Sequence, residues 1–479
     1  MRKYTSFFIA IVMIFSMLIF PTVTDASSLL EKTVKSNVGS SPASVTLRSA
    51  KTGKIIFNHK GDIARQPASN MKLLSGATAL SILGEDYRFS TDLYIDGDID
   101  ESTLNGNVYL KGSGDPTLLY KDLKSIASKL TEYGVEKVNG DVYLDDTVFT
   151  GSTLPPGSTP SEETYYYAAR TSALNMSPNE DFDAGSVIVE VTGATAGKVP
   201  TVKVIPHTSG QQIIINASTG KSGSSTSISV KRKTNTNQIV ISGNIAPGKS
   251  TKAWVTVQDP TLATGHAFVG ALEEKGIILA NDSKVTKKAV DASKTLHVYT
   301  HYSRTLASMF NTFMKLSNNS MADNFTRAVG AQIRHQGNLN SGLNVMRSYL
   351  ASIDVNSKGL TLYDGSGLSS KNKVSTNTIS QLLYEVQKEP TFNTFYQSLP
   401  VGGNSNRLIG GTLKNRFTGS SYAGRVIAKT GHIDGVYSLS GYVKTKKGNT
   451  FVFSILTENQ SSSSITKIDK IVKTVIDFY

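Results

Sequence analysis

The chain has 479 residues, none of them cysteine, and a formal net charge of +13. The absence of cysteine excludes a disulfide framework, a thiolate metal site, an iron–sulfur cluster and a cysteine nucleophile. With 39% hydrophobic and 18% charged residues, the composition is that of a globular protein, and its positive charge favours anionic partners.

The N-terminus has the three parts of a secretory signal. A basic start, Met1-Arg2-Lys3, precedes an apolar run over residues 7–20, and small residues follow in Thr24-Asp25-Ala26-Ser27. The run is short for a membrane span, so we predict a signal peptide over residues 1–26, with an anchored helix as the alternative. The protein is then exported to the cell wall, the outer face of the cytoplasmic membrane or the medium, where nucleic acid is not a partner.

The first motif opens a predicted helix. Residues 69–83 have apolar side chains at helical spacing, and Gly84 follows as a stop signal. Ser69 and Lys72 lie three residues apart and therefore on one helical face. A serine needs a neighbouring base to act as a nucleophile, and the positive end of the helix dipole favours negative charge on its oxygen. Ser69 and Lys72 are therefore candidates for a nucleophile and its base.

Two middle segments differ in charge, and both have strand-like patterns. Residues 85–190 hold 20 acidic and 7 basic residues, whereas residues 191–258 hold no acidic residue and 8 basic ones. Alternating apolar runs interrupted by Gly, Asn and Ser predict mostly β structure in both segments. We predict that the change of charge marks separate structural units. The cluster Lys231-Arg232-Lys233 is a candidate for binding an anionic wall polymer, and the alternative is an ordinary solvated face.

The second motif, Ser317-Asn318-Asn319, follows a helical apolar pattern over residues 304–316 and precedes another helix near residue 322. A second serine at this polar break can relay a proton to a leaving amine, and an amide can orient the substrate and Lys72. Ser317 and Asn319 are the candidate site residues of this motif. The alternative is that these residues only cap helices.

The third motif is Lys429-Thr430-Gly431-His432. It lies after the apolar strand 425–428 and before an antiparallel hairpin over residues 436–455. A strand edge offers backbone hydrogen bonds to an extended peptide, and a glycine permits its close approach. The charge of Lys429 favours a neutral Lys72 and attracts a substrate carboxylate.

The remaining signals concern the C-terminus and metal binding. Residues 465–476 form a helical pattern with one apolar face, which we expect to pack on the sheet; contact with a membrane surface is the alternative. His297 and His301 have a zinc-like spacing, but four strand residues would hold the two rings roughly 13 Å apart. We therefore predict no metal and no cofactor.

The order of the three motifs is that of penicillin-binding proteins and class A β-lactamases. From about residue 30 to its end, the chain resembles the class C, type-4 low-molecular-mass penicillin-binding proteins, which are D-alanyl-D-alanine carboxypeptidases and endopeptidases. The stretches that support the resemblance are Lys111-Gly-Ser-Gly-Asp-Pro-Thr117, Gly140-Asp-Val-Tyr-Leu-Asp-Asp146, Ser320-Met-Ala-Asp323, Asp364-Gly-Ser-Gly-Leu-Ser369 and Gly411-Thr-Leu-Lys-Asn-Arg-Phe417.

The resemblance implies an α/β (α+β) transpeptidase-like catalytic domain, in which helices flank an antiparallel sheet, with two nested and mostly β inserted domains. The insertions account for the 244 residues between Lys72 and Ser317. We predict a discontinuous catalytic domain over residues 27–90 and 300–479. A β-rich inserted domain, also discontinuous, covers residues 91–118 and 207–299. A second domain, over residues 119–206, is nested within the first inserted domain.

The resemblance also implies a role for each motif residue. Ser69 attacks the carbonyl between two D-alanines after Lys72 removes its proton, and the backbone N–H groups of Ser69 and His432 form the oxyanion hole. Ser317 passes the proton to the leaving D-alanine, and Asn319 positions the acyl side and Lys72. The residues that bind the terminal carboxylate and complete the substrate-binding strand are Lys429, Thr430, Gly431 and His432. Penicillin enters by the same route and is trapped on Ser69.

Three positions depart from the family pattern. His432 stands where the family more often has Thr or Ser, and Ser370-Lys371 stands where relatives tend to have Arg. Residues 158–163 lack the Trp and Asp with which relatives often hold the free amino end of the stem-peptide side chain. Glu162 and Glu163 are the candidate electrostatic substitutes there.

We therefore predict a serine D,D-carboxypeptidase that acts on peptidoglycan stem peptides and is acylated by β-lactams. Cleavage of crosslinks, an endopeptidase activity, is left open. A β-lactamase is the enzymatic alternative, and the large insertion and the lack of a Glu-x-x-Leu-Asn deacylation motif argue against it. A non-catalytic wall-binding protein that has kept the motifs is the alternative from another class.

Overall fold

Strands from the two ends of the chain form one antiparallel sheet. The computed structural model describes residues 23–208 and 210–479, and its first sheet has the order β18-β19-β20-β1-β2. Along β19, successive side chains point to opposite faces, so Leu439 and Val443 enter one hydrophobic core and Tyr442 enters the other. The bounds are β1 Ala43–Ser49, β2 Ile55–His59, β18 Val426–Ile433, β19 Val436–Lys444 and β20 Thr450–Thr457.

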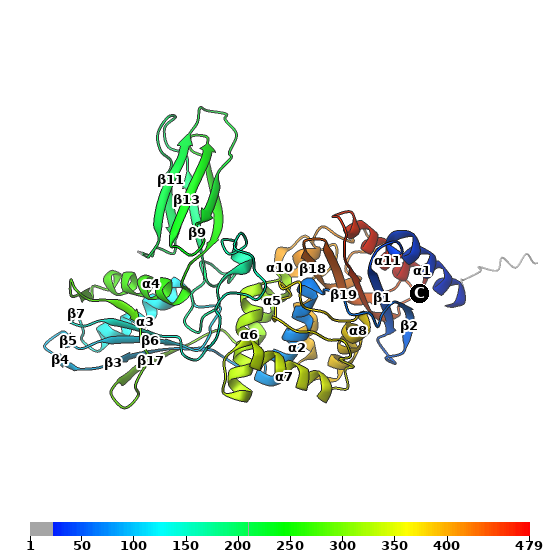
Figure 1. Cartoon of the computed structure of the whole chain (residues 1–479), viewed down its shortest axis with the longest axis horizontal. Helices are drawn as coiled ribbons and strands as arrows, with labels where there is room; N and C mark the ends of the chain where they lie inside the picture. Colours follow the sequence, from blue (N-terminus) through cyan, green and yellow to red (C-terminus); the bar gives the residue numbers. More distant parts are fainter. Residues whose placement is uncertain (1–22, 209) are drawn as a thin grey trace, which may run out of the picture.

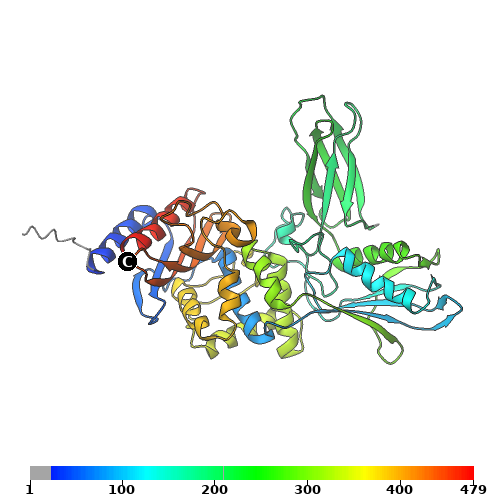
Figure 2. The same cartoon turned by 180° about the vertical axis from the view of Figure 1, so that it is seen from behind.

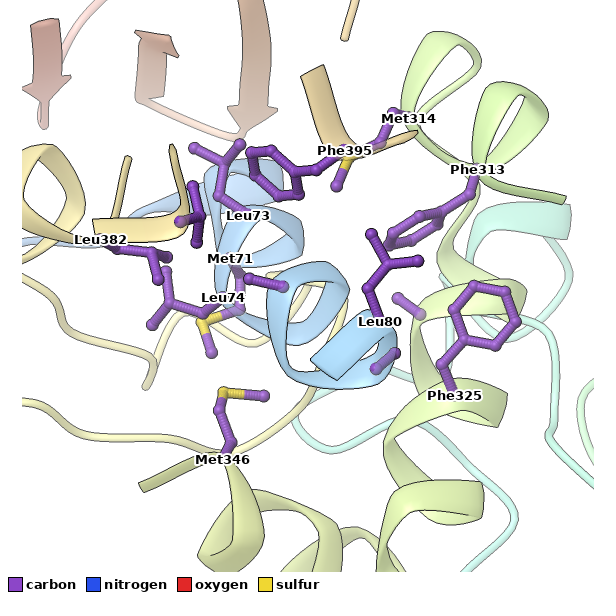
Figure 3. Close-up of a cluster of buried hydrophobic side chains, with 14 of the residues drawn as sticks. Met71, Leu73, Leu74, Leu80, Phe313, Met314, Phe325, Met346, Leu382 and Phe395 are labelled. Carbon is purple, nitrogen blue, oxygen red and sulfur yellow. The ribbon is translucent and has the colours of Figure 1, made fainter. Parts of the chain in front are cut away.

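Helices cover both faces of this sheet. α1 (Val23–Val38) and α11 (Ser464–Phe478) pack together on one face, and α2 (Met71–Leu83) lies within the helical layer on the other. Figure 3 shows α2 among Phe313, Phe325 and Phe395. All ten residues from Met71 to Leu80 are buried, so α2 is a central helix. The other helices of this unit are α5 Leu306–Lys315, α6 Asn319–Arg334, α7 Leu339–Ser352, α8 Thr376–Glu385, α9 Phe392–Ser398 and α10 Arg407–Gly410.

The inserted segment first builds a mixed unit. Its two sheets have the orders β16-β8-β6-β3-β17 and β15-β7-β5-β4. α3 (Tyr120–Glu132) and α4 (Pro260–Glu274) pack against them around one hydrophobic core. The strand bounds are β3 Ser90–Ile95, β4 Asp98–Asp100, β5 Thr103–Asn105, β6 Val108–Gly112, β7 Lys137–Val138, β8 Val142–Asp145, β15 Ile278–Leu279, β16 Val285–Lys287 and β17 Leu296–Tyr302.

A second, all-β unit is nested within the first. Its two three-stranded sheets, β10-β9-β14 and β11-β13-β12, enclose a small core of their own. Figures 1 and 2 both show this unit projecting away from the rest of the molecule. The strand bounds are β9 Ser186–Thr192, β10 Thr201–Ile205, β11 Gln212–Thr219, β12 Ser229–Arg232, β13 Gln238–Ile245 and β14 Ser250–Thr256.

The strand pairings correct the predicted ranges of the two inserted domains, 91–118 with 207–299 and 119–206. β8 lies in the second range, yet it pairs with β6, which lies in the first. β9 also lies in the second range, yet it pairs with β14, which lies in the first. The strands and helices of the mixed unit therefore span 90–145 and 260–302, and those of the β unit span 186–256. The acid-free stretch 191–258 follows the β unit closely, so the change of charge does mark a structural boundary.

The first described helix, α1, and the C-terminal helix, α11, lie on the same face of the first sheet (Figure 1). Residues 1–22 of the predicted signal peptide lie outside the described residues, and the predicted mature start, Ser27, falls inside α1. The apolar face of α11 is buried against the sheet, as predicted, which leaves it unavailable to a membrane. In the described part of the chain, no helix is both long and apolar enough to cross a membrane.

Candidate active site

Ser69 lies in a single helical turn, η1 (Ala68–Asn70), which leads directly into α2. The turn is held against the edge strand of the sheet, because the side-chain amide of Asn70 donates to the backbone oxygen of Lys429 at 2.9 Å. Ala68, just before the serine, has a φ of +46°, a conformation that residues other than glycine rarely adopt. The local backbone thus fixes Ser69 at the start of the central helix, as the first motif predicts.

Lys72, the second residue of α2, is fully buried one turn beyond Ser69, and its side-chain nitrogen has three oxygen neighbours. Nζ lies 3.0 Å from Ser69 Oγ, 2.6 Å from Asn319 Oδ1 and 2.8 Å from the backbone oxygen of Ser366. A neutral amine in this position keeps two N–H groups for Asn319 and Ser366 and turns its lone pair to the Ser69 hydroxyl. The geometry therefore suits a proton acceptor for Ser69.

The surroundings of Lys72 favour that neutral form. Burial lowers its pKa to about 7, although the carboxyl groups of Asp323 and Asp364 act in the opposite direction. Burial likewise raises the pKa of Asp323 to about 7 and raises the pKa of Asp364. Asp364 is held by backbone N–H groups of Gly367 and Ser369, each at 2.6 Å. A lysine that titrates near neutrality suits acid–base work at physiological pH.

In the second motif, one residue has a structural role and the other two contact the lysines of the site. Asn318 caps α6, because its Oδ1 accepts from the backbone N–H of Met321 at 2.9 Å. Ser317 has a φ of +60° and accepts from Lys429 Nζ at 2.8 Å. Asn319 donates to the backbone oxygen of Tyr167 at 2.7 Å, which turns its own oxygen toward Lys72. Helix capping thus accounts for only the middle residue of the motif.

The third motif occupies the edge strand β18. Lys429 is fully buried, and burial together with the charge of Lys72 lowers its pKa well below the usual value. Thr430 donates to the hydroxyl of Thr412 at 2.7 Å, and the exposed ring of His432 stacks on Tyr437 at 4.7 Å. A Cβ on Gly431 would lie 2.2 Å from Ser438 Oγ and 2.9 Å from the backbone nitrogen of Ser69. This position therefore requires glycine.

These residues meet in a cleft of about 440 Å³. Ser69, Ser317, Asn319 and His432 line it from the sheet–helix unit, and the inserted segment supplies the opposite wall. That wall consists of Glu162, Tyr166, Tyr167 and Asp183. The structure thus brings the first, second and third motifs together at one cleft, although they lie far apart in the sequence.

Of the two predicted electrostatic substitutes, only Glu162 lines the cleft. Glu163 is buried and paired with Arg170 at 2.8 Å and with Arg232 at 2.9 Å. Burial alone would raise the pKa of Glu163, but the bonds from the two guanidinium groups hold it below its usual value. Glu163 is therefore a structural residue that fixes the loop carrying Glu162.

Arg232 accordingly does not belong to a solvated basic cluster. Its side chain is fully buried and also donates to Gln258 Oε1 at 2.6 Å, whereas Lys231 and Lys233 are exposed. Of the three residues predicted to bind an anionic polymer, only these two lysines are free to reach one.

Replacing Arg232 by Met is therefore expected to destabilise the protein by about 3 kcal/mol, because the buried carboxylate of Glu163 then keeps only Arg170, the partly exposed one of its two guanidinium partners. Urea unfolding followed by circular dichroism measures the change. Lys231→Ala and Lys233→Ala are the matched controls, each expected to change stability by less than about 0.5 kcal/mol. Equal effects of all three substitutions would contradict the structural role of Arg232.

Some site residues have no role in the sequence prediction. Asp323, Asp364 and Ser366 lie in stretches that carried the family resemblance, but spacing alone did not connect them with Lys72. Asn70 and the backbone oxygen of Tyr167 also hold the site together. Backbone acceptors leave no trace in side-chain patterns, so these contacts appear only in the structure. Among the described residues, no group of three or more His, Cys, Asp or Glu side chains is placed to hold a metal ion.

A five-stranded sheet between helices, with two serine–lysine pairs facing one cleft, defines the penicillin-binding class of serine enzymes. Over residues 26–476 the chain matches the D-Ala-D-Ala carboxypeptidase 3 (S13) family, and it belongs to that family. It is a serine-type D-Ala-D-Ala carboxypeptidase of the type-4 low-molecular-mass branch, which confirms the prediction made from the three motifs.

Individual relatives agree with this assignment. The chain is 35% identical to a D-alanyl-D-alanine carboxypeptidase of Actinomadura sp. (strain R39), over 86% of this chain and 76% of that protein. Its fold matches the crystal structure of penicillin-binding protein 4 from Haemophilus influenzae with a TM-score of 0.80, at 23% identity, covering 94% and 99% of the two chains. The same protein complexed with a novel β-lactam gives a TM-score of 0.74 at 22% identity, with the same coverage. These matches give no support to the β-lactamase alternative.

Proposed function

We propose that Ser69 is the nucleophile and Lys72 its general base in the hydrolysis of the bond between two D-alanines of a peptidoglycan stem peptide. The observation that carries this proposal is the buried Lys72 Nζ, 3.0 Å from Ser69 Oγ, with its other contacts made to two acceptors. In the neutral form, its lone pair takes the Ser69 proton as Oγ bonds to the carbonyl carbon.

The departure of D-alanine is assigned to the second and third motifs. Ser317 Oγ, hydrogen-bonded to Lys429 Nζ, delivers a proton to the leaving nitrogen as the C–N bond breaks. Asn319 holds the acyl side and orients Lys72 through its fixed side-chain amide. Water then attacks the acyl-enzyme, releases the shortened peptide as a carboxylic acid and regenerates Ser69.

The substrate is proposed to lie along the edge of β18. The backbone N–H groups of Ser69 and His432 bind the developing oxyanion, and Lys429, Thr430 and His432 bind the terminal carboxylate. Two observations support this placement: β18 is an edge strand, and Gly431 permits a close approach to Ser69. β-Lactams acylate Ser69 by the same route.

We also propose that the enzyme is exported and works at the cell wall. Its substrate class is found there, and the basic N-terminus and apolar run have the form of a secretory signal. Lys231 and Lys233, exposed on the projecting β unit, are candidates for contact with anionic wall polymers.

Mass spectrometry of the protein after reaction with penicillin tests the assignment of the nucleophile. We expect one penicilloyl group, located on the peptide that contains Ser69, and release of D-alanine from a synthetic pentapeptide ending in D-Ala-D-Ala. Rapid hydrolysis of penicillin without a lasting adduct would indicate a β-lactamase instead. A protein that neither retains penicillin nor releases D-alanine would be the non-catalytic wall-binding protein.

The rate of acylation is expected to depend on pH through Lys72. Only the neutral amine accepts the Ser69 proton, and its pKa of about 7 makes the rate fall about tenfold per pH unit below neutrality and level off above it. Stopped-flow measurements with a fluorescent penicillin between pH 5 and 9 give the profile. A flat profile over this range would rule out Lys72 as the base.

A further inference from the structure

Asn318, the middle residue of the second motif, has no part in the chemical steps proposed so far. It borders the cleft, but it is 4% exposed, and both ends of its side-chain amide are occupied by contacts within the protein. The oxygen end caps α6 through Met321, which leaves the two N–H groups of the amide for other partners. Those partners belong to the inserted segment and not to α6.

The amide nitrogen of Asn318 contacts a turn at residues 181–183. It donates to the backbone oxygen of Phe182 at 2.8 Å and to that of Asp181 at 3.0 Å, and it lies 3.3 Å from Oδ1 of Asp183. Asp and Ser cap helices about as well as Asn, but Asp has no N–H group and Ser is too short to reach the turn. Capping alone therefore does not require an asparagine here, whereas the contacts with the turn do.

The turn that accepts these bonds is itself firmly held. Phe182 has a φ of +59°, which residues other than glycine rarely adopt, and its ring is buried in the core of the sheet–helix unit. Asp181 is paired with Arg407 of α10 through two contacts of 2.7 Å. Ser186, the first residue of β9, donates to the backbone oxygen of Asp183 at 2.6 Å. The turn thus joins the sheet–helix unit to the start of the β unit.

Ser317, which precedes Asn318, has a backbone conformation that needs such support. Its φ of +60° lies in the left-handed region, where a side chain is disfavoured unless the surrounding structure holds it. Asn319 and Ser320 also bond to backbone oxygens of the inserted segment, at 2.7 Å and 3.2 Å. Of these three successive side chains, that of Asn318 is the anchor next to Ser317.

We propose that Asn318 is a positioning residue for proton transfer to the leaving group. This inference rests on the proposed function and gives the inserted segment a part in it. By tying the second motif to the turn at 181–183, Asn318 keeps Ser317 Oγ 2.8 Å from Lys429 Nζ and within reach of the leaving nitrogen. No chemical step is added, since Ser317 still gives its proton to the nitrogen as the C–N bond breaks.

Two substrates that differ in one atom of the scissile bond separate this role from a general structural one. In a peptide ending in D-Ala-D-Ala, the leaving group is an amine, which departs only with a proton. In the matching thiolester, sulfur replaces that nitrogen, and the group leaves as a thiolate because thiols have pKa values of about 8.5. Both substrates need Ser69 and Lys72, but only the amide needs the proton from Ser317.

We expect Asn318→Asp and Asn318→Ser to lower kcat/KM for the amide about tenfold to a hundredfold, and kcat/KM for the thiolester less than about threefold. This constant covers the steps up to acylation, so deacylation does not enter the comparison. Measurements at pH 8 keep Lys72, whose pKa is about 7, mostly neutral. Circular dichroism selects a temperature at which every variant is folded. Ser317→Ala is the reference, with the same selective loss for the amide.

Asn338→Asp and Asn338→Ser are the matched controls. Asn338 caps α7, where its Oδ1 accepts from the backbone N–H of Ser341 at 2.9 Å, but its amide nitrogen has no hydrogen bond to any described residue. Both controls are expected to leave the two values of kcat/KM unchanged.

The ratio of the two constants, amide to thiolester, decides the outcome. A ratio in both Asn318 variants within about twofold of the parent value would overturn the inference, whether both constants fall together or neither changes. An unchanged ratio in Ser317→Ala would overturn the proposed role of Ser317, and this inference with it. A parent protein that neither acylates Ser69 nor releases D-alanine would instead overturn the proposed function as a whole.

Discussion

Replacing Lys72 by Met is expected to slow the acylation of Ser69 by penicillin by about 10³-fold or more. Met has a similar shape but no lone pair basic enough to take the hydroxyl proton. Lys72 Nζ is also the only hydrogen-bond partner that Ser69 Oγ has among the described residues. The substitution therefore removes both the proposed base and the contact that orients the hydroxyl. The rate constant for labelling by a fluorescent penicillin measures the effect, with Ser69→Ala as the reference for zero reaction.

Thermal unfolding separates this chemical role from a structural one. A fully buried amine is costly to keep in a folded protein, so a thioether in its place is expected to maintain or raise the melting temperature. Slow acylation in a protein that is at least as stable as the parent identifies Lys72 as a working base. Acylation within tenfold of the parent rate would contradict that assignment.

The three motifs were predictable because each is short and has its chemistry in its side chains. Ser69 and Lys72 lie one helical turn apart, and Lys429 and Gly431 share one strand, so local spacing was sufficient. Asp364 and Ser366 act on Lys72 from nearly three hundred residues away, through charge and through a backbone oxygen. Such contacts depend on the tertiary fold, and no local pattern in the sequence indicates them.

The boundaries of the two inserted units also depend on tertiary contacts that no local sequence pattern indicates. The change of charge near residue 190 coincides with the start of the β unit. Its first and last strands, β9 and β14, pair with each other, and most of the acid-free basic segment lies between them in the sequence. β6 pairs with β8, although α3 separates the two strands in the sequence, and the residue pattern of neither strand indicates its partner. The domain ranges predicted with the family resemblance were therefore wrong where the chain leaves a sheet and later returns to it. The prediction that Arg232 is a surface residue was wrong for a related reason. Its buried ion-pair partner, Glu163, lies outside the basic segment, so the sequence around Arg232 does not indicate the contact.

Replacing Gly431 by Ala is expected to slow acylation of Ser69 by about 10²-fold. The added methyl group would lie 2.2 Å from Ser438 Oγ and 2.9 Å from the backbone nitrogen of Ser69, so η1 and β18 must move apart. That movement displaces the proposed nucleophile, Ser69, and the proposed oxyanion donors relative to each other, and a shift of about 1 Å at a reacting centre costs roughly this factor. Fluorescent penicillin again measures the rate.

Gly270→Ala is the matched control, because a Cβ at that position on α4 has its nearest neighbour, Tyr120 Oη, at 3.4 Å, an ordinary contact. It is expected to leave acylation unchanged. Overpacking at Gly431 is also expected to lower stability by about 1–3 kcal/mol, so the rate is compared at a temperature where both variants remain folded. If folded Gly431→Ala reacts as fast as Gly270→Ala, the close approach of β18 to Ser69 is not needed for catalysis, and the oxyanion hole must be sought elsewhere in the cleft.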